Sequence, residues 1–90
     1  MLYPARLTLQ GRHVRAARAL LGWKQADLAR KAHISKGTIK RIEAEDGQVP
    51  VYYDTAKRII RTFEKAGVEF LDEDMPGVRL KLPKNKHNRA

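Results

Sequence analysis

The sequence predicts a mainly α-helical domain that contains a helix-turn-helix and ends in a short β-hairpin. Apolar residues recur at helical spacing through most of residues 1–67, and the stretch 25–43 divides into two short amphipathic helices. From residue 68 apolar and charged residues alternate, which is typical of strands. Ninety residues are enough for one modest core. We expect a helical domain over 1–67, a hairpin extension over 68–83 and a disordered basic tail over 84–90.

The charge of the chain favours a polyanionic partner. The net charge is +9 and the pI is near 10.3, although ribosomal proteins and membrane-surface peptides share this property. The absence of cysteine excludes disulfides and thiolate metal sites, and it fits a reducing compartment. The N-terminus lacks the apolar run of a signal peptide, and no segment approaches the roughly 20 apolar residues of a membrane span. We therefore expect a soluble cytoplasmic protein.

A first helix is predicted from Thr8, a plausible N-cap, to about Leu21, with Gly22 ending it. The apolar residues of its inward face recur at helical spacing, and arginines lie between them. Gly11 in the first turn weakens the prediction of where this helix starts. The apolar residues of the inward face are Val14, Ala17 and Leu21.

Two short helices follow over 25–32 and 35–45, the second capped by Ser35. Packing of their apolar stripes at a steep angle leaves small and cationic residues of the second helix facing outward. Such a helix suits the major groove of DNA, because Lys and Arg donate to guanine and Thr reaches a base or a phosphate. The stripes are Leu28, Ala29 and Ala32 in one helix and Ile34, Ile39 and Ile42 in the other, and the outward residues are Lys36, Gly37, Thr38, Lys40 and Arg41.

The fourth helix is predicted over 51–66, with Pro50 at its start and Gly67 just past its end. Two strands follow at 68–71 and 78–82, joined by a turn that contains most of the acidic residues of this region. An isolated two-stranded hairpin is marginal in water, so its apolar face must cover the helices or meet a partner. Pairing with the hairpin of a second chain would make a four-stranded sheet, and both alternatives are open. The possible dimer contacts are Val68, Phe70, Val78, Leu80 and Leu82.

Between Arg18 and about Ile60 the chain resembles the Cro/repressor-type helix-turn-helix family, which includes lambda-repressor-like and XRE-like regulators of bacteria and phages. This resemblance implies a compact bundle of four or five helices that acts as a homodimer on a partly palindromic operator. The residues that carry it are Arg18, the junction Leu21-Gly22-Trp23-Lys24-Gln25, Leu28-Ala29, Ile34-Ser35, Ile39, Ile42-Glu43, Gly47 and Pro50.

Position by position, the resemblance assigns Lys36, Gly37, Thr38 and Arg41 to the bases, with Thr38 also able to reach a phosphate. It assigns Gln25 to a phosphate, which agrees with the attraction of helix N-termini for phosphate. Further phosphate contacts are expected from Lys24, Arg30 and Lys40, and a structural ion pair is expected between Arg18 and Glu43.

One residue departs from the family pattern. The turn between the second and third helices normally holds glycine, and here it holds His33. We predict a positive φ at His33, at a cost of roughly 1 kcal/mol, because L-residues tolerate the left-handed region poorly.

No pattern of catalytic or metal-binding residues is found. The three histidines are too scattered for a metal site, and Ser35, the only serine, is already needed as a cap. No glycine-rich phosphate loop is present. Trp23 is interpreted as a residue at the edge of the core and not as a surface that binds a ligand. We therefore expect neither an enzyme nor a cofactor.

The sequence thus favours a sequence-specific DNA-binding regulator, a homodimeric repressor that associates with double-stranded DNA of the nucleoid. Two alternatives remain open. The chain would be the antitoxin of a toxin–antitoxin pair if the strands or the basic tail hold a protein partner. It would be an adaptor if the same fold binds RNA or another regulator in place of an operator.

Overall fold

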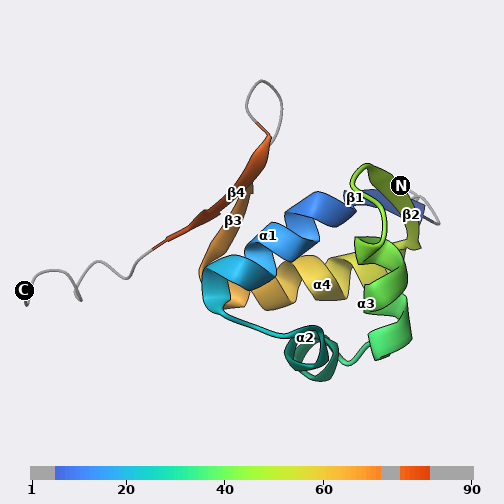
Figure 1. The fold of residues 1–90 in the computed structure, drawn as a ribbon, viewed down its shortest axis with the longest axis horizontal. Helices are drawn as coiled ribbons and strands as arrows, with labels where there is room; N and C mark the ends of the chain where they lie inside the picture. The colour runs from blue at the N-terminus through green and yellow to red at the C-terminus, as the bar shows by residue number, and fades with distance from the viewer. Residues whose placement is uncertain (1–5, 72–75, 82–90) are drawn as a thin grey trace, which may run out of the picture.

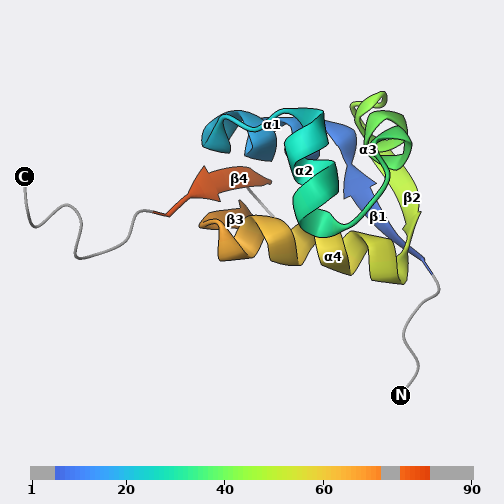
Figure 2. The same cartoon turned by 90° about the horizontal axis from the view of Figure 1, so that it is seen from below.

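Four helices and two small antiparallel sheets form the part of the chain that the computed structural model describes, residues 6–71 and 76–81 (Figure 1). The β1–β2 sheet lies at the N-terminal end of α4 and the β3–β4 sheet at its C-terminal end (Figure 2). In order, the elements are β1 (Arg6–Gln10), α1 (Gly11–Leu21), α2 (Gln25–Ala32), α3 (Lys36–Glu43), β2 (Gln48–Tyr52), α4 (Tyr53–Lys65), β3 (Val68–Leu71) and β4 (Gly77–Leu80).

Two predictions are wrong because β1 and β2 pair in a sheet. Thr8 is not an N-cap but lies within β1, opposite Pro50 of β2, and the fourth helix begins at Tyr53 rather than at residue 51. Val49 and Val51 are buried whereas the alternate residues of β2 are exposed, as expected for a strand that covers a core. Proline is tolerated in β2 because the strand has only β1 beside it within the described residues.

Gly11 is needed where β1 passes directly into α1. A Cβ atom at this position would lie 1.8 Å from the carbonyl oxygen of Glu45 and 2.5 Å from that of Ile42. The backbone N–H of Gly11 donates to the carbonyl of Gly47 over 3.1 Å. The start of α1 therefore packs directly on the backbone that follows α3, and only glycine fits there. At its other end α1 stops at Gly22, which has a φ of 70° and confirms the predicted C-cap.

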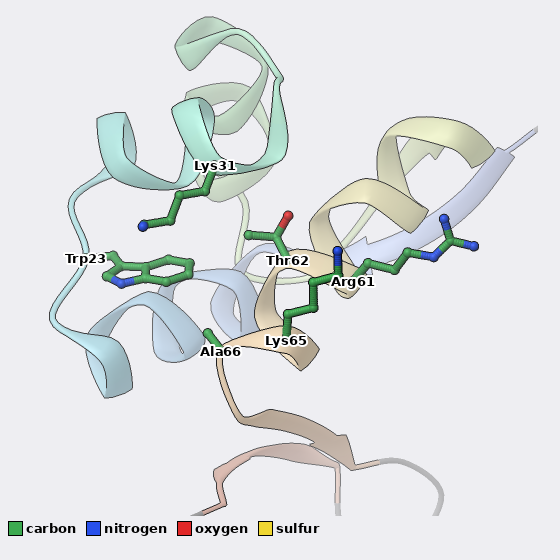
Figure 3. A pocket seen from close by; sticks show the side chains of 6 residues that line it. All are labelled: Trp23, Lys31, Arg61, Thr62, Lys65 and Ala66. Atoms are coloured by element: carbon green, nitrogen blue, oxygen red, sulfur yellow. The ribbon is translucent and has the colours of Figure 1, made fainter.

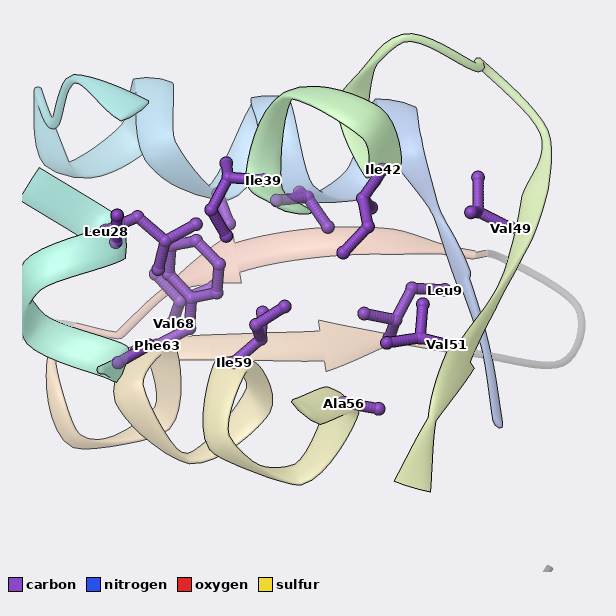
Figure 4. Close-up of a cluster of buried hydrophobic side chains, with 14 residues drawn as sticks. Leu9, Leu28, Ile39, Ile42, Val49, Val51, Ala56, Ile59, Phe63 and Val68 are labelled. Atoms are coloured by element: carbon purple, nitrogen blue, oxygen red, sulfur yellow. The ribbon is translucent and has the colours of Figure 1, made fainter. Parts of the chain in front are cut away.

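The core lies between α4 and the elements packed around it (Figure 4). Phe63 is fully buried and stacks on Trp23 with 5.6 Å between ring centroids. Phe63 also meets Phe70 of β3 at 5.9 Å, so one aromatic ring joins the helices to the hairpin. Trp23 is partly buried against this core, which confirms its predicted place at the core edge. The other fully buried large side chains are Leu28, Ile39, Ile42, Ile59, Val14, Val51 and Val68.

The turn between α2 and α3 has the predicted conformation. His33 has a φ of 58°, which confirms the left-handed residue, and Ile34 N–H donates back to the carbonyl of Ala29 over 3.0 Å. Ser35 caps α3, since its Oγ accepts from the backbone N–H of Thr38 at 3.1 Å. The α2 bounds agree with the prediction, whereas α3 is shorter than the predicted range 35–45.

The hairpin covers its own helices. Phe70 lies opposite Val78 and Val68 opposite Leu80, and all four side chains pack on the core, β3 against α4 and β4 against α1. Val68 is only 1% exposed, so its side chain belongs to the core of its own chain, and its role as a dimer contact stays a prediction. Leu82, the tail 84–90 and most of the predicted turn lie outside the described residues.

Candidate nucleic-acid interface

The outward surface of α3 consists of the residues expected to face DNA. Ile39 and Ile42 are fully buried against the rest of the bundle. Thr38 is half-buried, and its hydroxyl oxygen accepts from Ser35 Oγ at 2.9 Å, which ties it to the N-cap. The helix is therefore held on one face while the other is open to a groove. The exposed residues are Lys36, Gly37, Lys40 and Arg41.

Gly37 serves no packing need within the protein. A Cβ atom added there would meet only Ser35 Oγ, at 4.0 Å, and the residue has ordinary helical backbone geometry. Glycine inside a helix costs about 1 kcal/mol relative to alanine. The contrast with Gly11, where backbone atoms fill the space of a Cβ, indicates that packing among the described residues does not require glycine at Gly37.

Three arginines of α1 hold the C-terminal end of α3 and the turn that follows it. Arg12 Nε donates to the carbonyl of Asp46 at 2.8 Å. Arg15 donates to the carbonyl of Glu43 and pairs with the carboxylate of Asp46. Arg18 pairs with the Glu43 carboxylate. Cations are favourable at a helix C-terminus, where carbonyls lack intrahelical partners. This role of Arg12 and Arg15 was not predicted, although their i, i+3 spacing with Arg18 places all three arginines on one face of α1.

The ion pair between Arg18 and Glu43 is confirmed and is the centre of a network. Arg18 Nε and Nη2 each donate to a Glu43 carboxylate oxygen at 2.7 Å, and the Glu43 side chain is only 2% exposed. This bidentate hydrogen bonding raises the pKa of Arg18 further above its usual range. Arg18 Nη1 also donates to the carbonyl of Trp23 at 2.9 Å, which fixes the junction between α1 and α2.

The start of α2 carries the residues assigned to phosphates. Gln25 Nε2 donates to Glu43 at 3.1 Å, so in this structure the Gln25 side chain is oriented by the same carboxylate that binds Arg18. Asp27 accepts the backbone N–H of Lys24 at 2.8 Å, and this hydrogen bond is the main cause of the lowered pKa of Asp27. Arg30 lies 3.4 Å from Asp27 and remains mostly exposed. Phosphate contacts by Lys24, Gln25, Arg30 and Lys40 stay predictions.

The part of the chain that the structure describes offers no group of three or more histidine, aspartate or glutamate side chains arranged to hold a metal ion. None of its helices is both long enough and apolar enough to cross a membrane.

Comparison with known proteins identifies the family. A model of the helix-turn-helix family matches residues 14–69, which is more than half of the chain and includes most of α1 and all of α2, α3 and α4. A search of curated proteins gave no significant match. The match covers the network of Arg18, Glu43 and Gln25 and all the exposed residues of α3, whereas β1 and β4 lie outside it. The chain therefore belongs to the helix-turn-helix family of XRE and lambda-repressor-like DNA-binding regulators.

Proposed function

We propose that the chain is a sequence-specific repressor that reads its operator with the exposed face of α3. Lys36, Gly37, Thr38 and Arg41 meet base edges in the major groove, with Lys or Arg donating to guanine and Gly37 allowing the helix to approach closely. The observation that carries this proposal is the bracing of α3 by α1. The acidic residues Glu43 and Asp46 are neutralised by arginines, and the cations of α3 remain exposed.

Phosphate contacts fix the orientation of the domain in this proposal. Lys24 and Gln25 stand at the N-terminus of α2, where backbone N–H groups attract phosphate. Arg30 and Lys40 extend the same positive surface. These contacts supply sequence-independent affinity, whereas the residues of α3 supply the discrimination.

We further propose that the protein acts as a homodimer. The apolar face of the hairpin is used internally, and its other face carries the cross-strand pair Glu69–Arg79, with 2.7 Å between Oε1 and Nη2. An edge of the β3–β4 sheet is therefore the proposed contact, made by backbone hydrogen bonds between strands of two copies. A bound dimer would block other proteins from that DNA, which is the basis for proposing repression.

Selection from a random duplex pool tests this function. An inverted repeat with half-sites about one helical turn apart is expected, bound roughly 10³-fold more tightly than a scrambled duplex. Measuring affinity against salt concentration for both duplexes separates base readout from charge. Equal binding to every duplex would contradict sequence-specific recognition, and a single unrepeated half-site bound by one copy would contradict the homodimer.

A further inference from the structure

A pocket of about 310 Å³ lies beside Trp23. It is bounded by the loop between α1 and α2, the last turn of α2 and the C-terminal half of α4 (Figure 3). The residues that line the pocket are Trp23, Lys31, Arg61, Thr62, Lys65 and Ala66.

The pocket combines positive charge with an aromatic wall. Three of its lining residues are cations and none is acidic. Lys31 Nζ lies 5.3 Å from the centroid of the Trp23 ring, and in Figure 3 the Lys31 side chain reaches over the indole whereas Arg61 extends away from it. The Thr62 hydroxyl donates to the carbonyl of Arg58 at 2.7 Å, so its oxygen remains able to accept.

Arg61 of this pocket lacks the acidic partner that several other arginines have, and no lysine among the described residues forms an ion pair. Arg15, Arg18, Arg58 and Arg79 each pair with a carboxylate. Within residues 6–71 and 76–81, no carboxylate forms an ion pair with a cation of the pocket. Positive charge gathered without compensation around an aromatic ring favours an anionic occupant.

We propose that this pocket binds a small organic anion with a flat apolar body, an aromatic carboxylate. The carboxylate would be attracted by the cations that line the pocket, and the ring would lie at the edge of the Trp23 indole, because Phe63 and the Lys31 ammonium already contact the indole. The volume is at the lower end of the range for small-molecule pockets, so the ligand is of the size of one substituted ring.

A ligand bound in the pocket would affect residues of the proposed DNA interface through the backbone of Trp23. The Trp23 carbonyl accepts from Arg18, whose other nitrogens pair with Glu43. Glu43 in turn accepts from Gln25 at the start of α2. A ligand that shifts Trp23 therefore acts on the group that orients Gln25, and the site has the connections of an effector site.

Fluorescence titration without DNA tests the site, because Trp23 is the only tryptophan of the chain. Sodium benzoate is the probe, and benzamide is its uncharged counterpart of the same shape. We expect a saturable change in Trp23 emission with benzoate at a Kd of about 1 mM or below, and binding of benzamide that is roughly tenfold weaker. No saturable change up to about 20 mM benzoate, or equal binding of both compounds, would overturn the proposal.

Two lysine variants locate the binding. Lys65→Gln removes a cation of the pocket and is expected to weaken benzoate binding roughly threefold or more. Lys57→Gln removes a cation of the same helix whose ammonium lies near Tyr53, outside the pocket, and is expected to leave binding unchanged. Equal loss in both variants, or loss in neither, would overturn the assignment to this pocket. Because no DNA is present, failure here is distinct from failure of the proposed operator binding.

Discussion

Arg18 and Glu43 join the first helix to the last residue of the third through two parallel hydrogen bonds of 2.7 Å. The Glu43 side chain is almost wholly buried and Arg18 is 19% exposed, so this pair is shielded from solvent. The same carboxylate orients Gln25, and the same guanidinium holds the carbonyl of Trp23. The pair therefore positions both helices of the helix-turn-helix relative to α1.

Removing one partner of this pair is expected to destabilise the fold. Arg18→Ala leaves Glu43 buried without its cation, at a cost of about 3–5 kcal/mol in the free energy of unfolding. Urea denaturation of the variant and the parent measures this difference. Arg79→Ala is the control, since it breaks the exposed Glu69–Arg79 pair and is expected to change stability little. Equal losses in the two variants would contradict the central role of Arg18.

Two glycine variants should have opposite effects on stability. Gly37→Ala is expected to stabilise the fold by about 0.5–1 kcal/mol, because alanine is the better helix former and its methyl group meets open space. The same variant is expected to weaken operator binding, since the added methyl group would lie at the base-facing surface. Thermal unfolding and a DNA titration on one preparation check both effects, and operator binding equal to that of the parent would remove the role proposed for Gly37.

Gly11→Ala is the matched counterpart within the core. Its Cβ would lie 1.8 Å from the Glu45 carbonyl oxygen, so the start of α1 and the segment after α3 must separate. We expect a loss of about 1–3 kcal/mol or more, which is the range for overpacked sites. A thermal midpoint unchanged from the parent would show that this close approach is absent in solution.

Base and phosphate contacts are distinguished by two further variants. Arg41→Ala is expected to relax base preference at one position of each half-site and to cost about 1–3 kcal/mol on the preferred operator. Lys24→Ala is expected to weaken binding to all duplexes alike and to reduce the salt slope by about one. Repeating the selection with each variant checks this, and an unchanged preferred operator with Arg41→Ala would exclude that residue from base readout.

Substitutions at His33 measure what the left-handed turn costs in the free energy of unfolding. Its φ of 58° is reached more easily by glycine, so His33→Gly is expected to stabilise the fold by up to about 1 kcal/mol. His33→Val is expected to destabilise it, because a β-branched residue is disfavoured at positive φ. Chemical denaturation of both variants measures the order, and a His33→Val protein as stable as the parent would contradict this account of the turn.

The pH dependence of stability should include a contribution from Asp27. Its pKa is lowered in the folded state, chiefly by the hydrogen bond from the Lys24 backbone N–H. A group with a lowered folded pKa adds stability above its unfolded pKa, near 3.8, and loses that contribution as pH falls through the folded value. The stability difference between the parent and Asp27→Asn should therefore shrink as denaturation is measured at progressively lower pH below about 4. A difference that is constant with pH would exclude this titration.

The helix-turn-helix could be predicted from local signals. Apolar spacing identified the buried faces of α2 and α3, and the predicted caps Gly22 of α1 and Ser35 of α3 have the expected conformation and hydrogen bond. Each of these signals acts within a few residues, since a cap satisfies backbone groups of its own helix. The left-handed residue His33 was predicted from the family resemblance, which places glycine at this turn. The ion pair between Arg18 and Glu43 came from family resemblance, because its partners are 25 residues apart.

The β1–β2 sheet could not be predicted in the same way. Pro50 has the features of a residue that opens a helix and Thr8 those of an N-cap, yet the two lie opposite each other in a sheet. Strand pairing depends on a partner about 40 residues away in the sequence, so local propensity was overridden by the burial of Val49 and Val51. The helix therefore starts at Tyr53, after the strand is complete.

Periodicity and capping signals were enough to predict four helices, the bounds of α2 and the residues of α3 that face outward. The folded structure was needed to show that Arg12 and Arg15 hold the end of α3 and the turn after it, that Val68 belongs to the core, and that cations line a pocket beside Trp23. The difference lies in the sequence separation over which each interaction acts. Periodicity and capping act within a turn or two of chain, whereas charge pairing, burial and cavities depend on residues that folding brings together from distant parts of the sequence.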